Sequence, residues 1–335
     1  MTDPLRDLLA RRPVVVADGA MGTSLFALGL ETGASPEMWN LEHPERVRAV
    51  HQGFVEAGAD LILTNSFGGN RFRLALHGAE ARVAELNRAA ARLAREVADA
   101  AGRPVLVAGS MGPTGEIFAP IGPLAPEAGA AAFAEQAAAL ADGGCDLLWI
   151  ETISAAEELE AAVAGAARTG LPVVATMTFD THGRTMMGLT TAAAMALRER
   201  LAVRPVAFGA NCGIGPAQLV DSVLGLAAAA APGDVIVAKG NCGVPRYQEG
   251  QIHYDGTPEI MAAYACLARD AGARVIGGCC GTTAAHVRAM VAALAATPPG
   301  PPPERAAIEA ALGPIGTAAA AADGTGRARR PRRRG

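Results

Sequence analysis

The sequence predicts an α/β fold, a (βα)8 TIM barrel, and three observations lead to this prediction. The chain has 335 residues, 50% of them hydrophobic, so it can bury one large core. Short β-rich runs that end in glycine and polar residues recur along its length. Stretches long enough for a helix separate these runs. We therefore expect one barrel domain over residues 1–297.

Eight runs are the predicted strands. They lack a clean alternation of apolar and polar residues, which indicates burial on both faces, as in a parallel sheet. An open, doubly wound sheet uses the same units and is the alternative, but eight evenly spaced units favour closure. In chain order the runs span 13–22, 59–69, 104–115, 145–154, 172–180, 205–216, 234–245 and 273–283.

The segments between the runs are alanine-rich or amphipathic, as expected of helices that cross back over a sheet. Pro44 and Pro216 stand at positions typical of a first helical turn, and Thr283 is a candidate N-cap. The clearest helical segments are 43–59, 81–102 and 127–144.

Residues 298–335 form a predicted C-terminal tail rich in proline, alanine and arginine. We expect it to be disordered, with one possible short helix at 304–312. Its last residues carry six arginines against a net charge of -4 for the whole chain. Because arginine outnumbers lysine 28 to 1 throughout, compositional bias explains this tail better than a nucleic-acid site does.

No apolar run approaches the roughly 18 residues that a membrane span needs, and the first residues lack the features of a signal peptide. Six cysteines are few for a disulfide framework in a chain of this length, so we expect reduced thiols. These features predict a cytoplasmic protein without a membrane partner. They do not specify an oligomeric state.

In a (βα)8 barrel the loops after the strands form the active face, so residues at these positions are the candidate site. Three of the six cysteines fall after the sixth and eighth predicted strands. The candidates are Asp18, Gly19, Asn65, Ser110, Glu151, Thr152, Asp180, Asn211, Cys212, Asn241, Cys242, Cys279 and Cys280.

Cys279 and Cys280 are adjacent in a Gly-Gly-Cys-Cys-Gly turn, which suggests that both sulfurs point at a ligand, since a vicinal disulfide would be strained. Zinc takes thiolates in tetrahedral geometry, and catalytic sites keep one position open. Two loops that supply Cys212, Cys279 and Cys280 would give zinc three ligands and leave the fourth position open. The alternative is that all six cysteines are buried small hydrophobes.

The other cysteines have different predictions. We assign Cys145 and Cys266 to packing, because one begins a strand and the other lies in a helix. Cys242 is ambiguous, since a fourth thiolate would close the site and make it a structural zinc or redox-thiol centre rather than a catalytic one.

Zinc with three thiolates activates water poorly but holds a further thiol as thiolate at neutral pH, a species suited to alkyl transfer. Asp18, Glu151 and the backbone N–H groups near Gly19 and Gly112 could fix an amino-acid head group. For Asp18 a plain turn role is the alternative. Glu151, at the end of an apolar strand, has fewer such explanations.

The motifs DGAMGT, TNSF, GSMGP, ET, GANCG, GNCGVP and GGCCGTT resemble the homocysteine S-methyltransferase family over residues 12–297. This family includes betaine-homocysteine methyltransferases and the homocysteine-binding module of cobalamin-dependent methionine synthase. The resemblance implies a zinc ion on Cys212, Cys279 and Cys280, with homocysteine as the substrate thiol. It implies that Glu151 holds the amino group. Asp18 and Gly19 would lie against the amino-acid backbone, and Asn241 would be an auxiliary oxygen ligand.

The resemblance leaves the methyl donor open. Thr152 stands where betaine-using animal enzymes carry a tyrosine, and Cys242 where related enzymes often have alanine. Betaine is the first expectation and would need aromatic faces for its quaternary ammonium. The alternatives are S-methylmethionine, S-adenosylmethionine, or a corrinoid protein that serves this chain as the homocysteine-binding subunit of a split methionine synthase. The aromatic candidates are Trp39, Phe67, Phe72, Phe118, Tyr247 and Tyr254.

Overall fold

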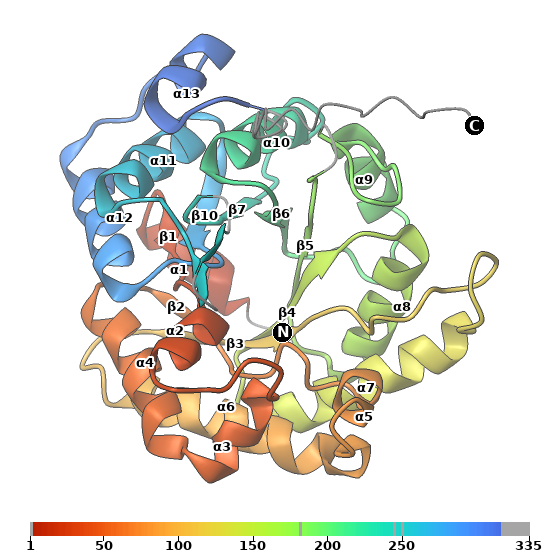
Figure 1. The fold of residues 1–335 in the computed structure, drawn as a ribbon. Coiled ribbons are helices and arrows are strands. Elements are labelled where there is room, and N and C mark those ends of the chain that lie inside the picture. Colours follow the sequence, from red (N-terminus) through yellow and green to blue (C-terminus); the bar gives the residue numbers. More distant parts are fainter. Residues whose placement is uncertain (1–2, 181–182, 244–245, 249–250, 316–335) are drawn as a thin grey trace, which may run out of the picture.

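Eight parallel strands form a barrel with helices around the outside (Figure 1). The computed structural model describes residues 3–180, 183–243, 246–248 and 251–315. A bridge between Ala17 and Leu61 joins the first strand to the second, so the closed barrel is confirmed over the open sheet. Every predicted run contains one barrel strand. These are β1 (Val15–Val16), β2 (Leu61–Leu63), β3 (Leu106–Met111), β4 (Leu147–Ile153), β5 (Val173–Met177), β6 (Ala207–Cys212), β7 (Ile236–Gly240) and β10 (Ala273–Gly278).

The predicted helical segments correspond to α4 (Pro44–Glu56), α6 (Val83–Asp99) and α7 (Pro126–Asp142). Thr283 is the N-cap of α12, as predicted. A hairpin of β8 (Arg246–Gln248) and β9 (Gln251–His253) follows β7 and was not predicted. Within the described ranges no helix is long and apolar enough to cross a membrane. The remaining helices are α1 (Pro4–Arg11), α2 (Met21–Ala27), α3 (Trp39–Glu42), α5 (Arg71–Ala75), α8 (Ala156–Ala166), α9 (Thr191–Arg198), α10 (Pro216–Ala228), α11 (Pro258–Asp270), α12 (Ala284–Ala296) and α13 (Arg305–Leu312).

The barrel has an inner and an outer apolar layer. The inner cluster contains alternate strand residues such as Trp149 and Val237, which face the lumen because strand side chains alternate between the two faces. Leu5 and Leu9 of α1 join this cluster. The outer cluster combines the opposite strand face with the helices. Both faces of the sheet are therefore buried, which explains the continuous apolar runs.

The described part of the predicted tail, residues 298–315, contains helix α13 at the position of the predicted short helix. Helix α13 packs on α10 and α11, and Ile308 is completely buried. Arg269 fixes the approach to α13 by donating hydrogen bonds to the carbonyl oxygens of Thr297 and Pro298, at 2.6 and 2.9 Å. Proline-rich composition suggested disorder, but burial of an isoleucine stabilises the helix. Residues 316–335 lie outside the described residues.

Candidate active site

The lumen changes from apolar to polar at the carboxyl ends of the strands. Trp149 faces the lumen on β4, so Glu151, two positions further, also faces inward. On β7, Lys239 follows the lumen-facing Val237 by two positions, so Lys239 also faces the lumen. Ser110 near the end of β3 is buried beside them. Charged and hydroxyl groups thus lie next to the apolar side chains that fill the lumen.

Three cysteine sulfurs converge at this end of the barrel. Cys212 ends β6, whereas Cys279 and Cys280 directly follow β10. Among the described residues, their Sγ atoms form a cluster in which all lie within 4.8 Å of one another. Thiolates that share a tetrahedral zinc at about 2.3 Å lie ~3.8 Å apart, so the cluster matches a zinc site in size.

The backbone holds these sulfurs in place. The Cys279 N–H donates to the carbonyl oxygen of Gly240 at 2.7 Å, and the Cys280 N–H donates to Asn241 Oδ1 at 3.0 Å. Cys212 has a φ of 62°, in the left-handed region. For a residue other than glycine this conformation costs of order 1–3 kcal/mol and is typical of functional sites. The ends of β6 and β10 therefore aim the sulfurs at one point, and the end of β7 supports them.

The thiols resist ionisation without a cation. The hydrogen bond with Cys212, burial, and the charges of Cys212 and Glu151 together hold the pKa of Cys279 well above its usual range. A divalent cation would reverse this preference, because a coordinating thiol is deprotonated. The donor set of three soft sulfurs fits zinc and leaves one coordination position for a further ligand.

Glu151 places a buried carboxylate in the same pocket. Its Oε1 accepts a hydrogen bond of 2.5 Å from Ser110 Oγ. Burial raises the pKa of Glu151, while the positive charge of Lys239 and the Ser110 hydrogen bond partly offset this effect. A cationic ligand group would stabilise the charged form further. Glu151 is thus suited to bind an ammonium group.

Asp18 and Lys239 form an ion pair across the lumen between β1 and β7. Lys239 Nζ lies 2.8 Å from Asp18 Oδ1, and the two side chains are 3% and 1% exposed. The other oxygen, Asp18 Oδ2, accepts the Leu63 N–H at 2.8 Å. Burial alone would lower the pKa of Lys239, but the charges of Asp18, Glu151 and Cys279 raise it. The geometry therefore places the lysine ammonium against Asp18 inside the pocket.

Thr152 and Asn211 connect the Glu151 strand to the sulfur cluster. The Thr152 N–H donates to Asn211 Oδ1, and Asn211 Nδ2 donates back to Thr152 Oγ1, both at 2.8 Å. The same Nδ2 lies 3.9 Å from Cys279 Sγ. Thr152 has a φ of 66°, a rare value for a β-branched residue. The reciprocal hydrogen bonds offset the strain and fix the direction of Glu151.

The three cysteines and the polar groups around them, apart from Asn211 and Asn241, line one pocket of about 1190 Å³, larger than the ~300–1,000 Å³ of ordinary small-ligand sites. Its outer part is formed by segments after β1 and β2, including Phe26, Phe67 and Arg73. Tyr254 also lines it. The predicted site residues that line it are Asp18, Gly19, Asn65, Ser110, Glu151, Thr152, Cys212, Cys279 and Cys280.

Comparison with known proteins identifies the family. The model of the homocysteine S-methyltransferase family matches residues 15–294, which is most of the chain. The chain belongs to the homocysteine S-methyltransferase family. It is therefore a methyltransferase, as the sequence predicted.

Relatives of known name agree with this assignment. The chain is 35% identical over 310 residues to methionine synthase from Mycobacterium tuberculosis and 34% identical to that from Mycobacterium leprae. Each match covers 87% of this chain but only 25% of the relative, so the chain spans about a quarter of their length. The metallated form of the homocysteine methyltransferase MmuM from Escherichia coli has a similar structure. It is 29% identical, with a TM-score of 0.74, and the match covers 87% of this chain and 99% of MmuM.

Two predicted substrate residues of this methyltransferase have evident structural roles. At Gly19 a Cβ atom would lie 2.4 Å from the carbonyl oxygen of Thr282, so only glycine fits there. Asn65 Nδ2 donates to Pro36 O at 2.7 Å and to Asn40 Oδ1 at 3.0 Å. Both residues line the pocket, and direct substrate contact stays a prediction for them.

Asn241 and Cys242 are engaged with protein groups. Asn241 accepts from Cys280 and donates to the carbonyl oxygen of Gly213 at 2.6 Å, so its role as a metal ligand stays a prediction. Cys242 Sγ lies 3.0 Å from Gly256 O and 3.3 Å from His286 Nε2, and it is not in the described sulfur cluster. This geometry argues against a fourth thiolate ligand.

The remaining cysteines lie apart from the sulfur cluster found among the described residues. Cys145 is buried, and burial raises the pKa of its thiol. Cys266 is half-buried on α11. These placements agree with the packing roles that the sequence predicted.

Lys239 is the site residue that the sequence analysis missed. Two signals were available: it is the only lysine in the chain, and it stands two positions after lumen-facing Val237 in an apolar strand. A long cationic side chain at such a position must find a buried partner. The partner, Asp18, is 221 positions away in sequence, so the pair itself was not predictable.

Proposed function

We propose that this chain is a zinc-dependent homocysteine S-methyltransferase that makes methionine. The observation that carries the proposal is the cluster of Cys212, Cys279 and Cys280 in the pocket that also contains Glu151. These three cysteines would hold zinc, which when bound supplies a place where a substrate thiol is held as thiolate at neutral pH. The membership of the chain in the methyltransferase family supports the reaction class.

The other residues of the pocket would orient homocysteine. Glu151, steadied by Ser110, would accept hydrogen bonds from the ammonium group. With the amino group fixed at β4 and the sulfur at the ends of β6 and β10, the substrate spans the top of the lumen. This placement leaves the sulfur facing the outer part of the pocket, where a donor methyl can approach in line.

For the donor we favour a methyl-corrinoid carried by another protein. The named relatives are methionine synthases, and the match covers a quarter of their length. In them the matching region is therefore joined to further parts of the same chain. Exposed large apolar side chains also lie in the segments that follow strands β1, β2, β3 and β5. Exposed apolar surface is typical of a protein docking site. The side chains are those of Phe26, Leu28, Leu41, Phe67, Leu76, Ile117, Ile121, Met186 and Met187.

Betaine stays the alternative donor. Of the predicted aromatic candidates, Phe67 and Tyr254 line the pocket, whereas Trp39 and Phe118 are buried. The side chain of Tyr247 lies outside the described residues. Two or three aromatic faces, counting Phe26, are a small supply for a quaternary ammonium group.

A donor assay tests both parts of the proposal. The zinc-loaded protein is incubated with homocysteine and, in turn, methylcobalamin, betaine, S-methylmethionine or S-adenosylmethionine, and methionine is measured by mass spectrometry. We expect methionine from methylcobalamin and a loss of activity when zinc is removed by a chelator. Turnover with betaine alone would contradict the corrinoid proposal. Full activity without metal would contradict the zinc site.

A further inference from the structure

Lys239 has an unusual combination of rarity, burial and position. The chain uses arginine at 28 positions and lysine only at this one. Its ammonium lies 5.7 Å from the centre of the Trp149 ring and pairs with Asp18 at 2.8 Å. A lysine ammonium is a compact point charge, whereas arginine presents a wide planar fork. The lumen between β1 and β7 therefore contains a small, fixed positive charge.

This charge determines how many negative charges face a ligand. Asp18 and Glu151 both line the pocket, and both are buried. Lys239 neutralises Asp18, whose second oxygen is also occupied by the Leu63 N–H. Within the described part of the chain, the hydrogen-bond partner of the Glu151 carboxylate is a hydroxyl donor, Ser110. The group of Asp18, Lys239 and Glu151 therefore carries one net negative charge instead of two.

We propose that Lys239 is a specificity-determining residue that lets the pocket accept a thiol carrying a carboxylate as well as an ammonium. Without Lys239, two buried carboxylates would repel the carboxylate of an amino acid and favour a simple aminothiol. With Lys239, the charge of Asp18 is neutralised, and one ligand ammonium balances the remaining carboxylate of Glu151. This inference rests on the proposed function, because it concerns how the same site recognises homocysteine.

Three thiols of similar length and different charge test the inference. Homocysteine is neutral overall, 3-aminopropanethiol lacks the carboxylate and is a cation, and 4-mercaptobutyrate lacks the ammonium and is an anion. Their affinities for the zinc-loaded full chain are measured by calorimetry. The quantity of interest is the affinity for homocysteine divided by the affinity for 3-aminopropanethiol. A residue that serves packing alone would weaken all three ligands together and leave this ratio unchanged.

Two single variants should move the ratio in opposite directions. Lys239→Met leaves two carboxylates without a cation and should lower the ratio about tenfold. This is the effect of one additional unit charge several ångströms from the ligand at the effective dielectric constant of a protein site. Asp18→Asn keeps Lys239 and should raise the ratio and improve binding of 4-mercaptobutyrate. Asp18→Asn is nearly isosteric, so it carries the test if Lys239→Met does not fold.

Two further variants serve as matched controls. Lys239→Arg keeps the charge and should leave the ratio within about threefold of wild type. The double variant Lys239→Met with Asp18→Asn restores one net negative charge and should return the ratio toward wild type, even where every affinity is lower.

The outcomes separate the inference from the proposed function. Opposite shifts in the single variants and recovery in the double variant support the role of Lys239. An unchanged ratio in all variants, with homocysteine still bound by wild type, overturns that role and leaves the proposed function intact. If the zinc-loaded wild type binds none of the three thiols, the proposed function fails and the inference fails with it.

Discussion

Buried acids lie at both ends of the barrel, but their surroundings differ. At the amino ends of strands, Asp60 is buried and the side chain of Asp234 is 7% exposed, and both acids pair with arginines. At the carboxyl ends, Asp18 pairs with Lys239, and Glu151 faces the pocket. The amino-end acids do not line that pocket.

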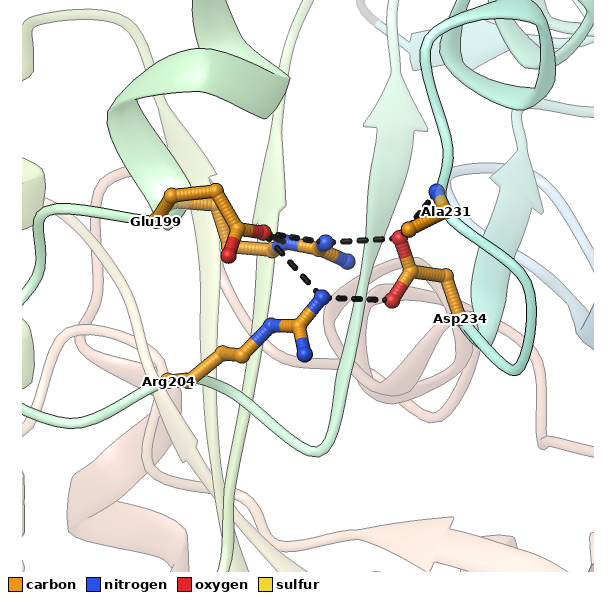
Figure 2. A network of polar contacts seen from close by, with 5 residues as sticks. Glu199, Arg204, Ala231 and Asp234 are labelled. Carbon is orange, nitrogen blue, oxygen red and sulfur yellow. Dashed lines mark hydrogen bonds and ion pairs between the residues drawn. The ribbon is translucent and has the colours of Figure 1, made fainter.

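Figure 2 shows how complete the amino-end network is. Asp234 accepts hydrogen bonds from Arg198 at 2.6 Å, from Arg204 at 2.8 Å and from the Ala231 N–H at 2.8 Å. Glu199 also binds Arg198. Both carboxylate oxygens of Asp234 are therefore used by the protein itself. Among the described residues, Glu151 has one hydrogen-bond partner, Ser110, and the pocket lies beside it. Incomplete pairing therefore distinguishes the proposed functional acid from the structural one.

The strongest test of this contrast removes a sulfur from the carboxyl end. Cys279→Ser should reduce zinc affinity by more than about 100-fold and should abolish methionine formation. Mutating a residue that only supports a metal ligand costs up to about 100-fold, and loss of the ligand itself should cost more. Metal analysis and the donor assay measure both effects. Cys266→Ser on α11 is the matched control and should retain zinc and activity. Equal zinc content in both variants would contradict the proposed site.

At the amino end, the largest effect should be on stability rather than activity. Arg198→Met removes the closest cation from the largely covered Asp234 side chain and should lower the free energy of unfolding by about 3 kcal/mol. Urea unfolding measures this change, and kcat/KM should stay at the wild-type value. Arg204→Met removes a half-exposed partner and should cost under about 1 kcal/mol. A loss of kcat/KM in folded Arg198→Met would contradict the purely structural role of the acids at the amino ends of the strands.

Glu151→Gln tests the functional acid. Loss of a charged hydrogen bond to the substrate ammonium should lower kcat/KM about 30-fold, chiefly by raising KM for homocysteine. Glu158 is a matched control, because it is buried but binds Thr114 on the protein itself at 2.7 and 2.8 Å. Glu158→Gln should keep KM unchanged in steady-state kinetics. A normal KM in Glu151→Gln would show that this carboxylate does not bind the ammonium.

The smallest expected effect is a pH dependence at the amino end. Burial would raise the pKa of Asp234, but the hydrogen bonds from Arg198 and Ala231 and the arginine charges lower it below 3.8. A lowered pKa contributes stability above 3.8 that is lost as the pH falls through the folded value. The stability difference between wild type and Arg198→Met should therefore shrink below pH 3.8. A constant difference in urea unfolding from pH 7 to pH 3 would contradict this mechanism.

The sequence predicted the barrel well because its signals are local. Apolar runs without alternation indicate strands buried on both faces, and each of the eight contains a barrel strand. The position of Cys212, Cys279 and Cys280 after two strands was enough to predict one cluster, since strand ends meet at one face of a barrel. The short tail helix was also predicted, but composition does not show that Ile308 has a place to pack.

What the sequence determined by itself is therefore the order of the elements and the face of the barrel where the chemistry collects. Only the tertiary structure decided which polar groups pair. Asp18 and Lys239 are brought together by barrel closure, and Cys242 is turned toward His286 and away from the other sulfurs. The physical reason is that periodicity gives the direction of a side chain relative to its own strand. The partner that it meets depends on strand register and loop shape across the whole barrel.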